Sequence, residues 1–360
     1  MKNKVAIITV HDFNGNFGST IQACSLCEYI RSLGWNPELI DYVPWGKSIR
    51  ATPIQLFMNL LKFPYRWLRN KRFSSYWKTR VSLSKRYSSF EELSANPPIA
   101  ERYFVGSDQV WNEVYPCGRD QAFYLAFTDS SEKYAFSASL GQEFTHEQLC
   151  RLHKKLQKFK RISVREKLSA EQIKAGGSNI PVEYTLDPVF LYDKDHYLQI
   201  CKGCAYPQYK YLLLYAIYPS SDNEQLFRIA RSYATKHKLK IVALGGMTRK
   251  EKFDKHIFCA GPKDFLTLIA HADFVLTHSF HGVAFSILLN TKFGCLEPTV
   301  SSLRIKNILE TAGIPERMIC DEKAVDIFDT HIDFESVNSK IQFMREKSRN
   351  VLREMLTVNQ

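Results

Sequence analysis

Two histidines in a setting typical of catalytic residues occur in the segment Thr277–Ser286. An apolar run precedes them and a helical pattern follows, so His281 falls in the first turn of a predicted helix. The positive end of a helix dipole favours neutral imidazole there, which makes His281 a candidate general acid or base. The neighbours expected to bind an anionic group beside it are His278, Ser279, Gly282 and, from the start of a later helix, Arg304.

A carboxylate and a guanidinium follow two apolar runs in the first half of the chain. Asp108 comes shortly after the run 102–105 and is a candidate base or hydroxyl acceptor. Arg165 leaves the run 162–164 toward the same edge of the predicted sheet, and its planar guanidinium suits bidentate binding of phosphate or carboxylate. Glu166 either begins the next helix or orients Arg165. The side chains expected near an acceptor on this side are Gln109, Trp111 and Asn112.

The loop 11–19 joins the first predicted strand to the first predicted helix. Its glycines let the backbone approach a ligand, and the helix that follows offers unpaired N–H groups to an anion. The loop has neither a GxGxxG fingerprint nor a P-loop, so an ordinary strand-to-helix connection explains it equally well. The candidate ligand contacts in it are Asn14, Asn16, Gly18 and Ser19.

Apolar runs alternate with helical patterns along almost the whole chain, which is typical of βαβ units and parallel sheets. The expected strands are residues 5–10, 38–42, 102–105, 134–137, 162–164, 182–186, 211–217, 240–244 and 274–277. The expected helices are residues 20–33, 146–159, 166–174, 223–237, 263–270, 283–289, 303–311 and 337–356. We therefore predict an α/β fold with two Rossmann-like, doubly wound domains that face each other across a cleft. Ligands bind such sheets beyond the carboxyl ends of the strands, where the candidate residues fall.

The expected domain boundaries depend on a weakly patterned stretch, residues 192–209, which resembles a linker. An N-terminal domain over residues 1–200 would bind the acceptor, and a C-terminal domain over residues 201–335 would bind the donor. Residues 336–360 are expected to form a charged amphipathic C-terminal helix.

Positive charge is concentrated in one part of the chain. There are 49 Lys and Arg against 37 Asp and Glu, a net charge of +12, and eleven of the basic residues lie between Asp41 and Glu91, where no acidic residue occurs. Within this insertion (about residues 47–86), Leu56–Phe73 mixes aromatic, Leu and basic residues at helical spacing. That composition is typical of a helix on an anionic membrane surface. A solvated basic helix is the alternative, and the aromatic residues disfavour nucleic acid.

Nine scattered cysteines, an odd number, are typical of a reducing compartment. Two pairs, Cys24 with Cys27 and Cys201 with Cys204, have Cys-x-x-Cys spacing. No His-rich partner accompanies either pair, so we expect structural roles and no metal. No run reaches the roughly 18 apolar residues of a membrane-spanning helix. The expected location is the cytoplasm, with the basic segment acting at the inner face of the cell membrane.

Six segments occur in a fixed order within residues 5–320. They are Asn16–Ala23, Gly106–Asn112, Ser137–Gly141, Ser163–Glu166, Leu186–Leu191 and Ser279–Gly282. Together they resemble the polysaccharide pyruvyl transferase family, which implies a GT-B-like fold and phosphoenolpyruvate as the usual donor. Two positions depart from the family pattern: His278, where members often carry Asp, and Ser279, where some carry Arg. The second departure leaves open which basic residue grips the donor.

The resemblance implies that pyruvate is transferred as a ketal to a sugar, of galactose type, in a surface polysaccharide or its lipid-linked precursor. We expect His281 as general acid or base, Arg165 as the phosphate or carboxylate clamp and Asp108 as base or orienter of the acceptor hydroxyl. No cofactor is expected, with phosphoenolpyruvate as co-substrate. Two alternatives stay open: a GT-B glycosyltransferase that uses a nucleotide-sugar, and a non-catalytic protein that binds anionic lipid or polyanion through residues 47–86.

Overall fold

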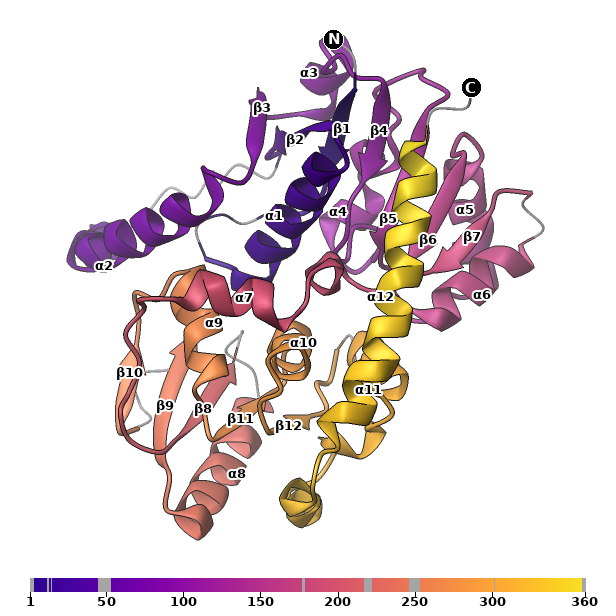
Figure 1. Cartoon of the computed structure of the whole chain (residues 1–360). Helices are drawn as coiled ribbons and strands as arrows, with labels where there is room; N and C mark the ends of the chain where they lie inside the picture. The colour runs from indigo at the N-terminus through magenta and orange to yellow at the C-terminus, as the bar shows by residue number, and fades with distance from the viewer. Residues whose placement is uncertain are drawn as a thin grey trace. The chain divides into compact units, whose positions relative to one another are not determined.

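The chain divides into two compact units, which are described separately. One consists of Met1–Leu191 with Met344–Gln360 and the other of Tyr192–Phe343 (Figure 1). The computed structural model describes residues 3–357 except 12, 14, 45–52, 177–178, 217–221, 246–252 and 301.

The first unit is built on a seven-stranded, wholly parallel sheet with the strand order β3-β2-β1-β4-β5-β6-β7. Its strands are β1 Lys4–Ile8, β2 Asn36–Tyr42, β3 Ser82–Tyr87, β4 Arg102–Val105, β5 Lys133–Ala138, β6 Arg161–Val164 and β7 Val182–Tyr184. Its helices are α1 Phe17–Ser32, α2 Pro53–Trp77, α3 Phe90–Ala95, α4 Pro116–Arg119, η1 Gln121–Tyr124, α5 His146–Leu156, α6 Lys167–Ala175 and η2 Pro188–Leu191. The order reverses between β1 and β4, which is the switch point where doubly wound sheets bind ligands.

The second unit repeats this topology with six parallel strands in the order β10-β9-β8-β11-β12-β13. Its strands are β8 Tyr211–Ala216, β9 Lys240–Gly245, β10 Lys255–Ile257, β11 Phe274–Thr277, β12 Phe293–Leu296 and β13 Met318–Ile319. Its helices are α7 Lys194–Cys201, α8 Asp222–His237, α9 Pro262–Ala270, α10 Phe280–Leu289, α11 Leu303–Ala312, η3 Pro315–Arg317 and η4 Glu322–Asp329. The switch point lies between β8 and β11. The prediction of an α/β fold with two Rossmann-like units is therefore confirmed.

The division between the units differs from the boundaries expected at residues 200 and 335. The stretch expected to be a linker contains α7, which packs against α9 and α10 and so belongs to the second unit. The C-terminal helix α12 (Phe334–Leu356) begins in the second unit, and its part from Met344 onward belongs to the first.

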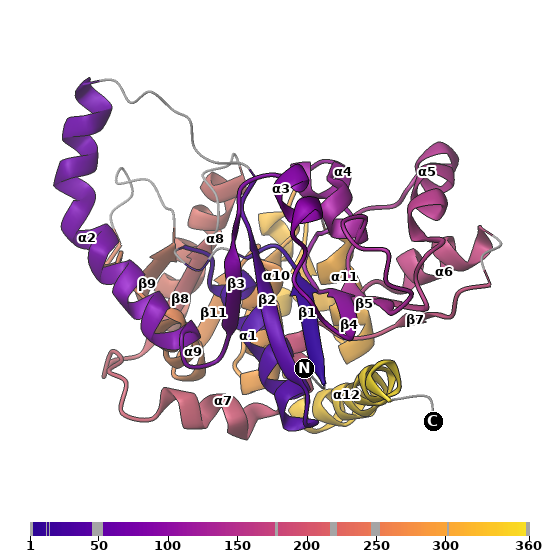
Figure 2. The same cartoon turned by 90° about the horizontal axis from the view of Figure 1, so that it is seen from above.

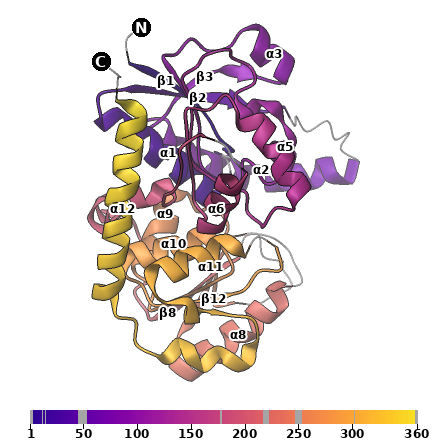
Figure 3. The same ribbon diagram turned by 90° about the vertical axis from the view of Figure 1, so that its right-hand side faces the viewer.

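Side-chain hydrogen bonds fix this last part of α12 to the first unit. Ser348 Oγ accepts a hydrogen bond from Leu186 N at 2.9 Å, and Arg345 Nε donates to Phe190 O at 2.8 Å. Arg353 donates to the hydroxyl of Tyr29 on α1 at 3.2 Å, and Figure 3 shows α12 beside α1. The C-terminal segment thus completes the first unit.

Four strands have no counterpart among those expected from the sequence: β3, β10, β12 and β13. Three of them have only two to four residues, too few to show a period. The fourth, β3, lies inside the basic insertion, and its exposed residues include Lys85 and Arg86. It forms the edge of the sheet, where charged side chains discourage pairing with another chain. The segment with helical spacing, residues 56–73, lies within α2, and the part of the insertion beyond it contains the strand β3.

Candidate active site

Three side chains meet at the carboxyl ends of β4, β6 and β7 in the first unit. The Arg165 guanidinium donates through Nη2 to Asp108 Oδ1 at 3.1 Å, and through Nη1 to Asp187 Oδ2. Ser107 Oγ donates to the same Asp187 oxygen at 3.1 Å. Arg165 and Asp187 are buried, whereas the Asp108 side chain is 14% exposed. Asp108 is therefore the carboxylate of this cluster that a substrate can reach.

A third carboxylate, Glu166, lies beside the same guanidinium. Its Oε1 is 3.9 Å from Arg165 Nε, and its two oxygens accept hydrogen bonds from Ser139 and Ser169. Burial by itself would lower the pKa of Arg165, but Asp187 and the other two carboxylates raise that pKa above its ordinary value. One guanidinium thus faces three carboxylates, and a cluster of this composition repels an anion.

The backbone beside this cluster is strained at two non-glycine residues. Asp108 has a φ of +75° and Ser137 a φ of +54°. Asp108 forms a backbone bridge to Ala138, and Ser137 Oγ donates to Leu186 O at 2.6 Å. Left-handed backbone at non-glycine residues persists only where surrounding contacts fix it, and it is concentrated at functional sites. The position of the Asp108 carboxylate is therefore set by its backbone as well as by Arg165.

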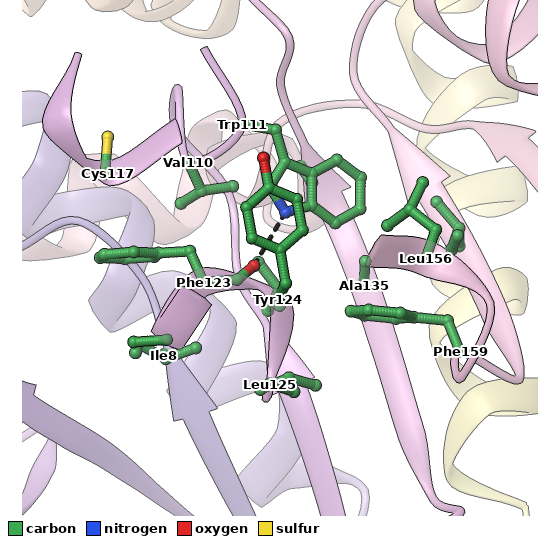
Figure 4. Packing of buried hydrophobic residues seen from close by; sticks show 14 of the residues in the cluster. Ile8, Val110, Trp111, Cys117, Phe123, Tyr124, Leu125, Ala135, Leu156 and Phe159 are labelled. Atoms are coloured by element: carbon green, nitrogen blue, oxygen red, sulfur yellow. Dashed lines mark hydrogen bonds between the residues drawn. The ribbon is translucent and has the colours of Figure 1, made fainter. Parts of the chain in front are cut away.

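The other residues predicted on this side make contacts within the first unit. Asn112 Nδ2 donates to Gln109 Oε1 at 2.7 Å, and a Cβ atom added to Gly141 would lie 2.4 Å from that oxygen. Trp111 is fully buried, and its indole N–H donates to Phe123 O at 2.8 Å. Figure 4 shows the Trp111 ring among apolar side chains. Trp111 is thus a core residue and not the predicted acceptor contact, because the core buries the whole indole and satisfies its one polar group.

The residues predicted in the loop before α1 cap that helix. Asn16 is the N-cap and accepts a hydrogen bond from Ser19 N at 3.1 Å, while Ser19 Oγ donates to Val10 O at 3.0 Å. Gly18 is buried in the first turn. Asn14 lies outside the described residues. These contacts fit the ordinary strand-to-helix connection, one of the two interpretations that the sequence left open.

A polar pair at the ends of β1 and β2 was not predicted. His11 Nε2 lies 3.3 Å from Asp41 Oδ1, and His11 Nδ1 lies 3.1 Å from Thr9 O. Arg86 Nε donates to the second Asp41 oxygen at 2.9 Å. The hydrogen bond from His11, with that from Arg86, holds the pKa of Asp41 below its usual range. The only signal in the sequence is that each residue follows or ends an apolar run.

In the second unit, the predicted histidines lie where β11 meets α10. Ser279 is the N-cap of α10 and accepts a hydrogen bond from Gly282 N at 3.4 Å. His281 occupies the first turn and is only 6% exposed. His278 Nε2 lies 2.9 Å from Asn223 Oδ1 at the start of α8. Because all of α10 is buried, the field of its N-terminus is weakly screened by water.

Two further predicted residues also lie at this helix start. A Cβ atom added to Gly282 would be 2.7 Å from Thr277 Oγ1, so glycine is needed for α10 to begin this close to β11. The guanidinium of Arg304, from α11, lies over the ring of Phe280 at 5.6 Å. A cation from a separate helix is thereby placed beside the first residue of α10. Arg304 thus lies beside Phe280, the residue between Ser279 and His281.

Both Cys-x-x-Cys pairs include buried thiols. Burial raises the pKa of Cys24 well above its usual value and that of Cys27 to about 12, and it raises the pKa of Cys201 as well. Thiols in such surroundings are poor nucleophiles and metal ligands. Within the described residues, no group of three or more His, Cys, Asp or Glu side chains is placed to hold a metal ion. No helix in this part of the chain combines the length and apolar character needed to span a bilayer.

The two units therefore differ in the ligand that each is suited to bind. The cluster around Asp108 offers a reachable carboxylate in acidic surroundings, which suits a neutral hydroxyl-bearing ligand. The start of α10 offers a helix N-terminus, an imidazole and a guanidinium, which suit an anion.

Comparisons with known proteins agree with this architecture. The family model described as polysaccharide pyruvyl transferase matches residues 16–299, which include all six segments of the resemblance. No curated protein matches the sequence. UDP-N-acetylglucosamine 2-epimerase from Rickettsia bellii is similar in structure, with a TM-score of 0.60, 10% identity and coverage of 98% of this chain and 96% of that one.

Two other solved structures show the same fold at low sequence identity. The UDP-GlcNAc 2-epimerase of Methanocaldococcus jannaschii, solved with UDP-GlcNAc and UDP, has a TM-score of 0.57 at 13% identity, covering 94% of this chain and 99% of that one. UGT2 of Phytolacca americana, solved with UDP-2-fluoro-glucose and pterostilbene, has a TM-score of 0.53 at 10% identity, covering 99% of each chain. These are GT-B proteins, so the predicted GT-B-like fold is confirmed.

Proposed function

The chain belongs to the polysaccharide pyruvyl transferase family, and we propose that it transfers pyruvate from phosphoenolpyruvate to a sugar as a ketal. The acceptor in this proposal is a galactose-type sugar of a surface polysaccharide, or of its lipid-linked precursor at the cytoplasmic face of the membrane. Family membership supports the class of reaction. The charges of the two units support the choice of donor and the roles of the residues.

Ketal formation from phosphoenolpyruvate proceeds through steps that each need a particular group. The C3 carbon of the enol takes up a proton, and one sugar hydroxyl adds to C2 and loses its own proton. The bond from C2 to the phosphate oxygen then breaks, which releases inorganic phosphate and leaves an oxocarbenium ion. A second sugar hydroxyl adds to C2 and loses its proton, which closes the ketal. The protein must therefore supply an acid, a base and electrostatic clamps.

The observation that carries the proposal is the positive character of the start of α10. Phosphoenolpyruvate bears a carboxylate and a phosphate, which a helix N-terminus and a guanidinium bind well. Arg304 lies over Phe280, and His278 and Ser279 complete the surroundings. We therefore propose that Arg304 is the cation that binds the donor. We assign His281, in the first turn of α10, to proton transfer at C3.

Asp108 is proposed to accept the proton of the attacking sugar hydroxyl. Its partial exposure makes it reachable, and its left-handed backbone fixes its direction. For Arg165 we propose a positioning role in place of the anion clamp, because its Nη1 and Nη2 atoms bind Asp187 and Asp108. A donor phosphate placed there would face three carboxylates, whereas a neutral sugar would not be repelled.

The decisive experiment measures inorganic phosphate released from phosphoenolpyruvate by the purified full chain. A panel of free and lipid-linked galactosides serves as acceptors, and mass spectrometry of the product detects the added pyruvyl ketal. Phosphate release that requires an acceptor, together with the ketal product, supports the proposal. Phosphate release without any transfer product on the panel would contradict the proposed acceptor class.

Thermal unfolding in the presence of ligands distinguishes the proposed pyruvyl transferase from a glycosyltransferase that uses a nucleotide-sugar. A ligand that binds the native state raises Tm, by an amount that grows with its concentration relative to its Kd. Phosphoenolpyruvate is expected to raise Tm, and Arg304→Gln should abolish the shift. A rise with UDP or GDP and none with phosphoenolpyruvate would favour a glycosyltransferase.

A further inference from the structure

Helix α2 presents aromatic side chains to solvent in its middle part, and its C-terminal end packs against the first unit. Phe63 is 61% exposed, and Tyr65 and Trp67 are each 55% exposed. Further along the same helix, Phe73 and Tyr76 are fully buried. Figures 1 and 2 show α2 extending outward from the sheet edge at β3, with its N-terminal end farthest from the sheet.

Aromatic stacking anchors the C-terminal end of α2. The ring of Phe73 stacks on Phe17 of α1 at 5.3 Å, and the ring of Trp77 stacks on Phe13 at 4.7 Å. These contacts fix the rotation of the helix about its axis. At about 100° per residue, Phe63, Trp67 and Lys71 then share a face whose centre lies opposite Tyr76.

The exposed face is basic as well as aromatic. Lys71 Nζ lies over the Trp67 ring at 5.3 Å. Lys78 is exposed in the turn that follows α2, and its Nζ lies 6.0 Å from the centre of the Trp77 ring. The segment between Asp41 and Glu91 has eleven basic residues and no acidic one, so no acid within it can neutralise these cations. The surface is therefore complementary to a ligand that combines dense negative surface charge with an apolar interior.

Part of the positive charge of the insertion has a structural explanation and is set aside. Arg80 pairs with Glu28 at 3.2 Å and Arg86 with Asp41 at 2.9 Å. Lys85 lies on the edge strand β3, where charge discourages strand pairing. These residues do not explain why Phe63 and Trp67 are exposed on α2.

We propose that α2 docks the protein on an anionic lipid leaflet through Phe63, Trp67 and Lys71, together with Lys78 from the turn that follows the helix. Cations alone would bind any polyanion, but exposed large aromatic rings gain free energy only where they leave water, as at the headgroup region of a bilayer. Each cation near an anionic leaflet contributes a factor of about five in affinity, so binding should be reversible and sensitive to salt. This inference does not depend on the identity of the donor or of the acceptor.

Sedimentation with vesicles tests the proposal on the full chain. The protein should bind vesicles of phosphatidylglycerol mixed with phosphatidylcholine at low salt, and it should release in high salt and from pure phosphatidylcholine. Lys71→Glu with Lys78→Glu should weaken binding by roughly 30-fold or more. The matched control is Lys154→Glu with Lys174→Glu, the same charge change at exposed lysines of α5 and α6, which should bind nearly as wild type does.

The aromatic residues are tested separately from the charge. Phe63→Ala with Trp67→Ala should lose most of the vesicle binding although every cation remains. Trp67 is one of five tryptophans, and a blue shift of fluorescence on binding should vanish in Trp67→Phe, which should still bind. Both α2 variants should retain transfer to a short water-soluble acceptor.

Two results would overturn the membrane proposal. One is vesicle binding that is unchanged in the aromatic double variant, which would leave charge alone as its cause. The other is binding to soluble polyglutamate with none to anionic vesicles at low salt, which would assign the surface to an anionic polymer. Neither result would bear on phosphate release, so each is distinguishable from failure of the proposed activity.

Discussion

The Nη2 atom of Arg165 lies 3.1 Å from Oδ1 of Asp108, so a guanidinium that follows β6 holds a carboxylate that follows β4. The other terminal nitrogen of Arg165 reaches Asp187, beyond β7. Three strand ends are tied together by one side chain. Asp108 is the partly exposed carboxylate of this cluster. Its contact with Arg165 therefore fixes the direction of a reachable carboxylate at the edge of the sheet.

Replacing Arg165 by Lys should lower kcat for pyruvyl transfer by roughly 10- to 100-fold. A single ammonium keeps the charge but cannot span Asp108 and Asp187 as two guanidinium nitrogens do. As Arg165 acts through Asp108, the KM for phosphoenolpyruvate should change little. Steady-state kinetics with the donor and the acceptor varied in turn measures both constants.

The matched control for Arg165 is Arg161→Lys at the opposite end of β6. Arg161 also uses two nitrogens on one carboxylate, that of Glu183, but lies away from the carboxyl ends of the strands. The Arg161→Lys variant should keep a near-normal kcat. If Arg165→Lys instead raises the KM for phosphoenolpyruvate at unchanged kcat, Arg165 contacts the donor and the positioning role is wrong.

Asp108→Asn should reduce kcat by about 100-fold or more while leaving the fold intact. The amide has nearly the shape of the carboxylate and can still accept hydrogen bonds from Arg165 and from Gln109 N, but it cannot take a proton from a hydroxyl. Circular dichroism and Tm should be close to wild type. An active Asp108→Asn variant would remove Asp108 as the base.

His281→Ala should also lower kcat by about 100-fold or more, through loss of the general acid or base. The matched control in the same unit is His256→Ala, since His256 lies on the edge strand β10, away from the start of α10. That control should retain activity. Full turnover by a folded His281→Ala enzyme would mean that the proton at C3 comes from another group.

Asp41 should make the stability of the protein dependent on pH in the acid range. Its pKa is lowered in the folded state, so its contribution is present above the unfolded pKa of about 4 and is lost as pH falls through the lower folded value. Asp41→Asn should therefore cost about 1 kcal/mol at pH 7, and this difference from wild type should shrink as pH falls below about 4.

Urea unfolding followed at several pH values measures the effect of Asp41. Asp129→Asn serves as the control, because Asp129 is exposed and its only ion pair, among those the structure describes, is a 3.8 Å contact with Lys158. It should shift the free energy of unfolding by no more than about 0.5 kcal/mol. A difference between Asp41→Asn and wild type that grows toward acid pH would contradict the assigned direction.

The fold class could be predicted from the sequence alone. Apolar periodicity is a local property of the chain, and alternation of buried strands with helices is typical of parallel α/β sheets. Asp108, Arg165 and Ser279 could be placed at strand ends for the same reason. The segments of the family resemblance lie at these ends, so the class of reaction could also be predicted.

Which groups face one another depends on the tertiary structure and could not be predicted. Arg165 and Asp187 are 22 residues apart, and Arg165 and Asp108 are 57 apart, so their pairing depends on which strands are neighbours in the sheet. That arrangement turned the predicted anion clamp into a residue bound by carboxylates. It also placed Trp111 in the core, because burial is set by what packs around a side chain and not by its neighbours in sequence.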